Sequence, residues 1–354
     1  MHGVEMLFYF QLKKHYAGRD ASIDDYLERK KHPYLQGIAA SMRQEAVENE
    51  VVGVLDRQGI PACIIKGNEI ARSLYGDPNC RCSSDIDVLV KKEDFFKADS
   101  ILQAARYVPI DKVPLAYFMY YDHHAKYHDP TTKNIIEVHW TCGLPGFFGL
   151  SPEEIWEEVG VESDGRLTLL PEMLMITLLI NHHIHSFREL RIIVDLLWAF
   201  HKYDRSIHWP EFAVRLKRLG LIKTTLIAIS QIEDLWPGGV SRMQSIREVK
   251  QSMMGMGYKT PNFLASYFRM NINKTSETNP YVNMFFARFA LDHLRTTFRS
   301  YLRNLFPPPE VIRELYHPAG WWMLPIGYLR YIVWKVKVWT GWRKRYGVGK
   351  SLNF

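Results

Sequence analysis

The feature that most constrains this chain is a pair of aspartates inside an apolar run. Residues 80–90 read CRCSSDIDVLV, so Asp85 and Asp87 interrupt a segment that otherwise predicts a buried β-strand. Side chains alternate along a strand, so the two carboxylates must point to the same side, about 7 Å apart. At an effective dielectric constant near 20 their repulsion is roughly 2 kcal/mol. We therefore expect a cation or a wet cleft beside them, as in a set of metal ligands.

The segments around this pair predict alternating strands and helices. Residues 60–67, IPACIIKG, form a short apolar run that ends at Lys66-Gly67, and residues 68–76 predict a helix. This alternation is typical of an α/β unit. The segments HHAKYHD and KNIIEVHW flank Pro130-Thr131-Thr132 and predict a β-hairpin. Strand patterns then stop, and helical periodicity dominates from Pro171 onward.

Turn residues divide the chain into four predicted regions. Pro33 is expected to end a first helix that begins near Ser22, and the cluster Ser163-Asp164-Gly165 is expected to mark a domain boundary. The predicted regions are N-terminal helices over 1–58, a core over 59–163, a helical region over 164–300 and a tail over 301–354.

Composition limits the cellular compartment and the kinds of binding partner that we expect. The 354 residues carry a formal net charge of +7, which permits anionic partners without choosing among them. The four cysteines form no C-x-x-C pair, so we expect a reducing, cytoplasmic setting. No uncharged run is long enough to predict a transmembrane helix.

The tail carries much of the basic excess. After Glu314 the sequence has no acidic residue, and its lysines and arginines are interleaved with tryptophan and tyrosine. Such residues are used at lipid interfaces, which predicts peripheral contact with a membrane. The alternative is that the tryptophans pack onto the helical region.

Three features in chain order predict the chemistry. Lys66-Gly67 lies at a strand-to-helix turn, Asp85 and Asp87 follow on the next strand, and Glu137 lies in the hairpin strand. A glycine at such a turn lets backbone amides approach a phosphate. Three carboxylates facing one cleft can hold two Mg²⁺ ions for displacement at phosphorus. The pattern therefore predicts nucleotidyl transfer.

Each of these residues also has an ordinary structural interpretation. Lys66 is equally typical of the end of a strand, and Glu137 would face solvent if the hairpin turned its other side inward, since Val138 must face the opposite way. His139 either touches substrate or packs beside Trp140. In the helical region Asp195 is expected to pair with Arg188 or Arg191, and the HHIH segment lacks a third ligand for zinc.

A family resemblance rests on the same segments. IIKG, RCSSDIDVLV, IIEVHW, HSFRELRIIVDLLW and IHWPEFAVRLKRLGL together resemble the uncharacterised bacterial nucleotidyltransferase family of the DNA polymerase beta-like superfamily. The resemblance implies an α+β fold, with a small mixed β-sheet core between N-terminal helices and a C-terminal helical region. It also implies Asp85, Asp87 and Glu137 as ligands of Mg²⁺ or Mn²⁺.

The resemblance further implies a substrate-binding set and a reaction. Its members are Lys66, Gly67, Asn68, Arg81, Ser84, His139 and His185. Many superfamily members carry serine where this chain has Asn68, and Asn181 with His185 stands where the family spaces two histidines one turn apart. The implied reaction moves a nucleoside monophosphate from an NTP, with ATP expected, to a hydroxyl-type acceptor and releases pyrophosphate. Nucleic acid is not indicated as a partner.

Two other function classes stay open. One is a nucleotide-binding regulatory module, similar to an antitoxin, that keeps the fold without turning its nucleotide over. The other is a membrane-surface accessory protein of a surface-polymer or modified-peptide pathway, located at the inner membrane through the basic tail.

Overall fold

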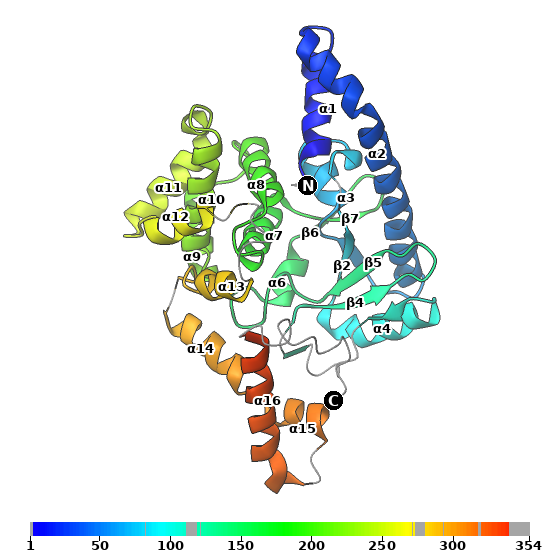
Figure 1. Cartoon of the computed structure of the whole chain (residues 1–354), viewed down its shortest axis with the longest axis vertical. Coiled ribbons are helices and arrows are strands. Elements are labelled where there is room, and N and C mark those ends of the chain that lie inside the picture. Colours follow the sequence, from blue (N-terminus) through cyan, green and yellow to red (C-terminus); the bar gives the residue numbers. More distant parts are fainter. Residues whose placement is uncertain are drawn as a thin grey trace.

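The computed structural model describes residues 3–81, 83–110, 119–120, 122–270, 272, 280–292, 294–317 and 320–339. The chain is a mixed α+β protein in which a small sheet lies between a long N-terminal helix and a helical half (Figure 1). The strands are β1 (Ala62–Ile64), β2 (Asp85–Val90), β3 (Val108–Pro109), β4 (His124–His128), β5 (Ile135–His139), β6 (Val159–Val161) and β7 (Leu167–Leu169). The predicted fold class is confirmed.

The main sheet has the order β1-β2-β5-β4-β3. β2 and β5 are parallel, whereas the pairs β1–β2, β4–β5 and β3–β4 are antiparallel. β4 and β5 form the hairpin that the sequence predicted around Pro130. The register aligns Asp87 of β2 with Glu137 of β5.

Strict alternation gives the sheet one apolar face and one face on which charged side chains lie beside Cys63 and Leu89. Ile86, Val88 and Val90 of β2 pack with Val51 and Leu55 in one hydrophobic cluster. That cluster is covered by α2 (Ala21–Asp56) and α4 (Phe95–Ala104). The residues between them on the strands must point to the opposite face, where the functional side chains gather.

The N-terminal helices depart from the sequence prediction at Pro33. After α1 (Glu5–Tyr16), α2 runs unbroken for 36 residues with Pro33 inside it. Asp20, not Ser22, caps its N-terminus by accepting hydrogen bonds from the Ser22 and Ile23 amides. The prediction that Pro33 ends the helix is therefore wrong. The length of α2 allows one helix to reach both the sheet and the Lys66-Gly67 turn.

Short helical turns connect β1 to β2. They are α3 (Asn68–Ile70), the π-helical turn η1 (Ala71–Tyr75) and the 3₁₀ turn η2 (Pro78–Cys80). A further 3₁₀ turn, η3 (Lys92–Asp94), connects β2 to α4. Farther along, α6 (Pro152–Glu157) precedes a second, two-stranded sheet of β6 and β7. The cluster Ser163-Asp164-Gly165 is the turn of this hairpin, so the expectation that strands stop after β5 is wrong.

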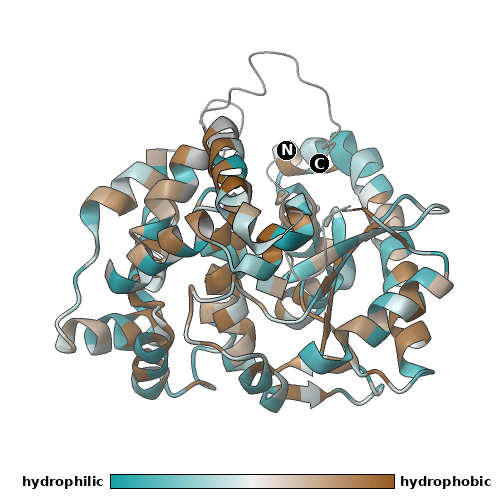
Figure 2. Cartoon of the chain, turned by 90° about the horizontal axis from the view of Figure 1, so that it is seen from below, coloured by the Kyte–Doolittle hydropathy of each residue, from teal (hydrophilic) through white to brown (hydrophobic). Residues whose placement is uncertain are grey.

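The helical half follows β7 and holds the largest hydrophobic cluster. Its first helices are α7 (Pro171–Ile184), α8 (Leu190–Lys202), α9 (Trp209–Leu219), α10 (Ile222–Leu235), η4 (Val240–Arg242) and α11 (Gln244–Gly255). The chain continues with α12 (Asn262–Met270), α13 (Pro280–Arg288), α14 (Leu294–Leu305), α15 (Pro309–Tyr316), η5 (Trp321–Met323) and α16 (Leu324–Trp339). Hydrophobic residues gather in the strands and the central helices, and hydrophilic ones at the periphery (Figure 2).

A buried ion pair joins the sheet region to the helical half. The Arg81 Nε atom lies 3.1 Å from Asp195 Oδ2, and both side chains are nearly inaccessible, at 4% and 0% exposed. The Tyr75 hydroxyl also donates to Asp195 Oδ1, at 2.5 Å. Asp195 therefore pairs with Arg81 of the segment before β2, and not with Arg188 or Arg191 as the sequence suggested.

The tail has one buried and one exposed side. Tyr331 of α16 is buried against Val311, Ile312 and Leu315 of α15. On the other side runs an exposed apolar stripe, spaced by three and four residues: Trp322, Ile326, Leu329, Val333 and Val336. Trp321 is 77% exposed as well, so these two tryptophans do not pack onto the helical half. Residues 340–354 of the predicted tail lie outside the described residues.

Asp195→Ala should destabilise the protein strongly. Removing one partner of a buried pair leaves the Arg81 charge uncompensated, which typically costs about 3–5 kcal/mol. The measurement is the free energy of unfolding in urea. Asp25→Ala is the matched control, because its pair with Arg29 is exposed and such pairs contribute little. Equal losses in the two variants would contradict the assigned role of the buried pair.

Candidate active site

The polar face of the sheet collects charged side chains from three neighbouring strands. Asp85 and Asp87 come from β2, Glu137 and His139 from β5, and Lys126 from β4. The register pairs Asp87 with Glu137 and Glu137 with Lys126, so the alternation of β-strands alone brings these groups into one row. The structure therefore turns Glu137 away from the apolar cluster formed by Val138.

Asp87 is buried between two nitrogen donors. Its Oδ1 atom lies 2.7 Å from Lys66 Nζ and 2.9 Å from His139 Nε2. Its side chain is 3% exposed and that of His139 is fully buried. The cation expected beside the aspartate pair is thus supplied by the protein itself, through Lys66.

Glu137 has its own basic partners. Lys126 Nζ lies 2.6 Å from Glu137 Oε1, and His139 Nε2 lies 3.6 Å from Glu137 Oε2. His124 Nε2 lies 3.7 Å from Glu137 Oε1. His139 therefore stands between the two carboxylates and contacts both.

These contacts keep both carboxylates ionised. Burial alone would raise the pKa of Asp87, but the Lys66 charge and the His139 hydrogen bond outweigh it and hold the pKa well below its usual range. Burial likewise opposes ionisation of Glu137, and hydrogen bonding from His139 with the charge of His124 lowers its pKa. Burial disfavours protonation of His139, yet its bonds to Asp87 and Glu137 raise its pKa.

Asp85 lies at the more open end of the row. Its Oδ1 atom accepts a hydrogen bond from Ser83 Oγ at 3.0 Å, and its backbone carbonyl accepts one from Gln44 Nε2 at 2.7 Å. Ser84 beside it is exposed. Both residues lie where a ligand approaching β2 from solvent can reach them.

Gly67 forms a turn that other residues would strain to adopt. Its φ of 58° lies in the left-handed region, and an added Cβ would come within 3.4 Å of Gln44 Nε2 and 3.5 Å of Glu48 Oε1. The turn is thus closely covered by α2. The turn brings the Lys66 ammonium group into contact with Asp87, and α3 begins at the residue after Gly67.

Three residues of the predicted substrate set have structural partners. Asn68 is fully buried, accepts a hydrogen bond from Ser41 Oγ and donates one to the Ser41 carbonyl. Arg81 lies in the pair with Asp195, with its Nη1 atom 3.5 Å from the Gly67 carbonyl. His185 ends α7 and pairs with Glu189 at 2.6 Å, in the helical half. The structure groups Lys66, Asp87, Glu137 and His139, and places these three outside that group.

Sequence reasoning did not select four residues that the structure brings to this site. Lys126 and His124 come from β4, His123 directly precedes β4, and Glu48 comes from α2. The pattern H-x-K in a strand predicted to pair with IIEVH is a signal for His124 and Lys126. Glu48 lies inside a long helix, and nothing in its local sequence predicts its place beside Gly67.

The donor set fits a divalent cation. One ligand atom each from Asp87, Glu137 and His139 lies within 4.8 Å of the other two. Carboxylate oxygens suit Mg²⁺ and Mn²⁺, and both carboxylates are already ionised. A cation bound there would have to compete with Lys66 for Asp87.

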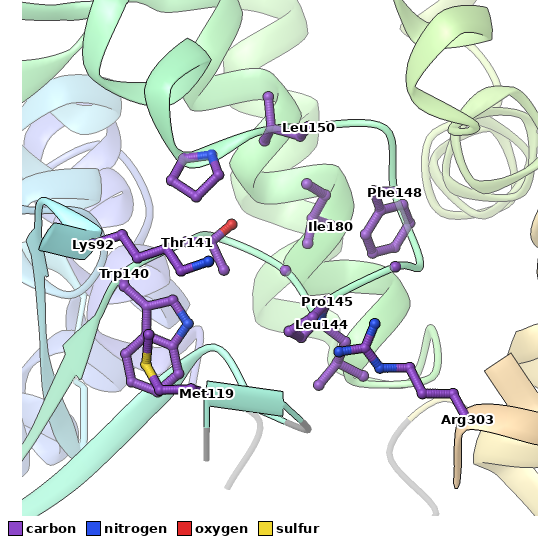
Figure 3. A pocket seen from close by; sticks show the side chains of 13 residues that line it. Lys92, Met119, Trp140, Thr141, Leu144, Pro145, Phe148, Leu150, Ile180 and Arg303 are labelled. Atoms are coloured by element: carbon purple, nitrogen blue, oxygen red, sulfur yellow. The ribbon is translucent and has the colours of Figure 1, made fainter. Parts of the chain in front are cut away.

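A separate pocket opens beyond the carboxyl end of β5. Its volume is about 320 Å³, and Trp140, Thr141, Phe148, Ile180 and Arg303 are among its lining residues (Figure 3). Gly143 in its wall cannot take a side chain without a clash, because a Cβ would come within 2.9 Å of Phe148. Neither Asp87 nor Glu137 lines this pocket, so it is not the place of the metal ligands.

Comparison with known proteins decides the family. A family model described as an uncharacterised nucleotidyltransferase matches residues 1–237, which is more than half of the chain. The chain belongs to this nucleotidyltransferase family. No curated protein and no solved structure matches the chain. The match includes α2, the main sheet and the helices to α10.

Glu48→Gln should change the pH dependence of stability. Burial raises the pKa of Glu48 to about 7, so the folded protein holds this proton more tightly than the unfolded chain does. A carboxylic acid whose pKa is higher in the folded state than in the unfolded chain lowers the free energy of unfolding as pH rises above about 4.5, and this decrease reaches its full size above about pH 7. We therefore expect Glu48→Gln to raise the free energy of unfolding at pH 8 by up to about 3 kcal/mol and to change it little at pH 4.5.

Chemical denaturation at the two pH values is the measurement. Glu28→Gln is the control, because Glu28 lies on the same helix with its side chain 77% exposed. The same stability difference at both pH values would contradict a buried, protonated Glu48.

Proposed function

We propose that the protein transfers a nucleoside monophosphate from an NTP, with ATP expected, to a hydroxyl-type acceptor and releases pyrophosphate. The observation that carries this proposal is the register of Asp87 with Glu137 on parallel strands, next to the Lys66-Gly67 turn. The family match supports a nucleotidyltransferase activity in general. Asp85, Asp87 and Glu137 are proposed to hold Mg²⁺ or Mn²⁺, which would supply Lewis-acid stabilisation of phosphate oxygens.

In this proposal Lys66 moves between two anions. In the nucleotide-free protein its ammonium group neutralises Asp87. A triphosphate at the Gly67 turn would attract the same group, because Lys66 directly precedes the turn. Asp87 would then lose its internal cation at the moment when the nucleotide delivers a metal ion. Nucleotide and metal are therefore expected to bind cooperatively.

Glu137 is proposed to act through its charge. The acceptor oxygen forms a bond to the α-phosphorus, the bond from the α-phosphorus to the oxygen that bridges it to the β-phosphate breaks so that pyrophosphate leaves, and the acceptor proton passes to water. A carboxylate whose pKa is held low is a weak proton acceptor, so Glu137 is better suited to stabilise positive charge beside the attacking oxygen. His139 keeps Glu137 and Asp87 at a fixed separation by contacting both.

Lys66→Met should separate metal binding from nucleotide binding. A unit charge about 4 Å from a divalent cation costs about 8 kcal/mol at a dielectric constant of 20, so we expect Mn²⁺ affinity without nucleotide to rise at least about tenfold. NTP affinity should fall, because the phosphate loses its ammonium partner. Calorimetry measures the affinities for Mn²⁺ and for NTP. Lys97→Met is the control, because Lys97 is exposed on α4. Unchanged affinities for both ligands would rule out the proposed exchange of Lys66.

Glu137→Gln should leave NTP binding nearly intact and slow turnover by at least about a hundredfold, or ~2.7 kcal/mol. The substitution keeps the size of the side chain and removes its charge. Turnover is measured as pyrophosphate release and as transfer of label from α-labelled NTP to acceptors in a cell extract. Glu211→Gln, an exposed substitution on α9, is the control.

Two outcomes would argue against this assignment. Normal turnover by Glu137→Gln would remove Glu137 from the reaction. NTP binding without pyrophosphate release or label transfer, in the unmodified protein, would favour the nucleotide-binding regulatory module instead.

The stripe on α16 favours a second proposal, peripheral contact with an anionic membrane. No described helix is long and apolar enough to span a bilayer. The stripe nevertheless exposes five apolar side chains in a segment without acidic residues. Together these features are typical of a helix that lies in a membrane interface. The protein would then be located in the cytoplasm at the inner membrane.

Leu329→Asp with Val333→Asp should abolish binding to vesicles of phosphatidylglycerol, and binding of the unmodified protein should weaken at high salt. Sedimentation with these vesicles is the measurement, and vesicles of phosphatidylcholine show whether charge is needed. Val214→Asp is the control for an added charge, because Val214 is exposed on α9. If the double variant and the unmodified protein sediment equally, the stripe does not contact lipid.

A further inference from the structure

Three histidine rings meet at the edge of the carboxylate row. His123 directly precedes β4 and His124 begins it, and the register places His124 opposite His139 of β5. The ring centroids are 4.5 Å apart for His123–His124, 5.3 Å for His123–His139 and 4.9 Å for His124–His139. Their exposed fractions are 6%, 9% and 0%. A buried group of three imidazoles needs a partner for its ring nitrogens.

The nitrogen positions resemble those around a tetrahedral ion. One ligand atom from each ring lies within 4.8 Å of the other two. His124 Nδ1 and His123 Nε2 are 3.3 Å apart. Two nitrogens bound to one tetrahedral Zn²⁺ at 2.0–2.1 Å would be separated by about 3.3 Å. His139 Nδ1 is buried and forms no hydrogen bond within the described residues.

The other nitrogen of each ring faces a carboxylate. His123 Nδ1 lies 2.9 Å from Asp122 Oδ1, His139 Nε2 lies 2.9 Å from Asp87 Oδ1, and His124 Nε2 lies 3.7 Å from Glu137 Oε1. Metal-binding histidines commonly use the second ring nitrogen in this way, which fixes the tautomer and the ring orientation. Of these contacts, the one between His139 and Asp87 is a hydrogen bond, which leaves His139 Nδ1 over, whereas His123 Nδ1 and His124 Nε2 lie near a carboxylate without a hydrogen bond to it.

Two other occupants fit this cluster poorly. An anion such as phosphate would lie beside the carboxylates of Asp122, Asp87 and Glu137, which face the same three rings and would repel it. Mg²⁺ prefers oxygen ligands, whereas imidazole nitrogen suits zinc and other late transition metals.

We propose that His123, His124 and His139 bind one transition-metal ion of the zinc class, at a site separate from the Asp85, Asp87 and Glu137 ligand set. His139 would bind it through Nδ1 and donate its Nε2 proton to Asp87, so this ion would hold the ring that positions the carboxylate. The side chain of His124 is 11% exposed, which leaves the ion a path from solvent. Zinc binding there does not require that the chain transfers nucleotides.

The first test uses the unmodified, untagged protein. Chelator-treated protein is dialysed against Zn²⁺ and then against metal-free buffer, and we expect about one zinc per chain to remain. X-ray absorption spectroscopy of the zinc-loaded protein counts the imidazole ligands without any substitution. Three imidazoles are expected for the proposed site. A single imidazole with oxygen ligands would place the ion at Asp87, Glu137 and His139 and overturn the proposal.

The second test separates the two ligand sets by substitution. His123→Asn and His124→Asn should weaken Zn²⁺ binding at least about a hundredfold, because loss of an outer partner alone costs about 10–100-fold. Asp87→Asn removes an outer partner of His139 but no ligand of the ion, so it should weaken Zn²⁺ binding by no more than about 10–100-fold. His128→Asn is the matched control, since His128 lies on β4 on the same face, opposite Ile135. Visible absorption of the Co²⁺-loaded variants gives an independent readout of tetrahedral binding.

Each result decides the assignment. Loss of zinc in the two histidine variants, with a smaller loss of affinity in Asp87→Asn and retention in His128→Asn, supports the site. Loss in Asp87→Asn with retention in His123→Asn and His124→Asn overturns it, as does an unmodified protein that keeps no zinc after dialysis. If a histidine variant fails to fold, the imidazole count in the unmodified protein still decides.

Discussion

The rest of the site depends on how the charge of Asp87 is compensated inside an apolar sheet. A buried carboxylate without partners would take up a proton or prevent folding. Here Lys66 from the end of β1 and His139 from β5 both contact its Oδ1 atom. These two contacts therefore fix the positions of the Lys66 segment, β2 and β5 relative to one another. Compensation also keeps the Asp87 carboxylate ionised, as a metal ligand would have to be.

The mixed sheet makes this compensation possible. Because β5 is parallel to β2, Glu137 and His139 lie beside Asp87 and Leu89. A shift by one residue would turn Glu137 and His139 into the apolar cluster and Val138 onto the polar face. The hydrophobic alternation that forms the core thus also sets the register of the site, and no separate device is needed to align the carboxylates.

Sequence was informative where the signal was local and periodic. Alternation predicted that Asp85 and Asp87 share a face, and the turn residues near Pro130 predicted the hairpin. Pro33 misled because a proline inside a helix is tolerated when the surrounding turns are held by packing, as α2 is by α1 and the sheet. The pairing of Arg81 with Asp195 and the position of Glu48 depend on contacts between distant segments, which periodicity cannot report. The roles of the site residues stay predictions.

The pair between Arg81 and Asp195 also bears on the order of events during synthesis. Arg81 lies directly before β2, but its partner is made more than a hundred residues later, on α8. Until α8 leaves the ribosome, the segment leading into the D-x-D strand has a guanidinium group with no carboxylate to bury it against. The sheet can therefore collapse early, while its polar edge reaches its final form only after the helical half has docked. A nascent chain stalled before α8 would expose this edge to chaperones.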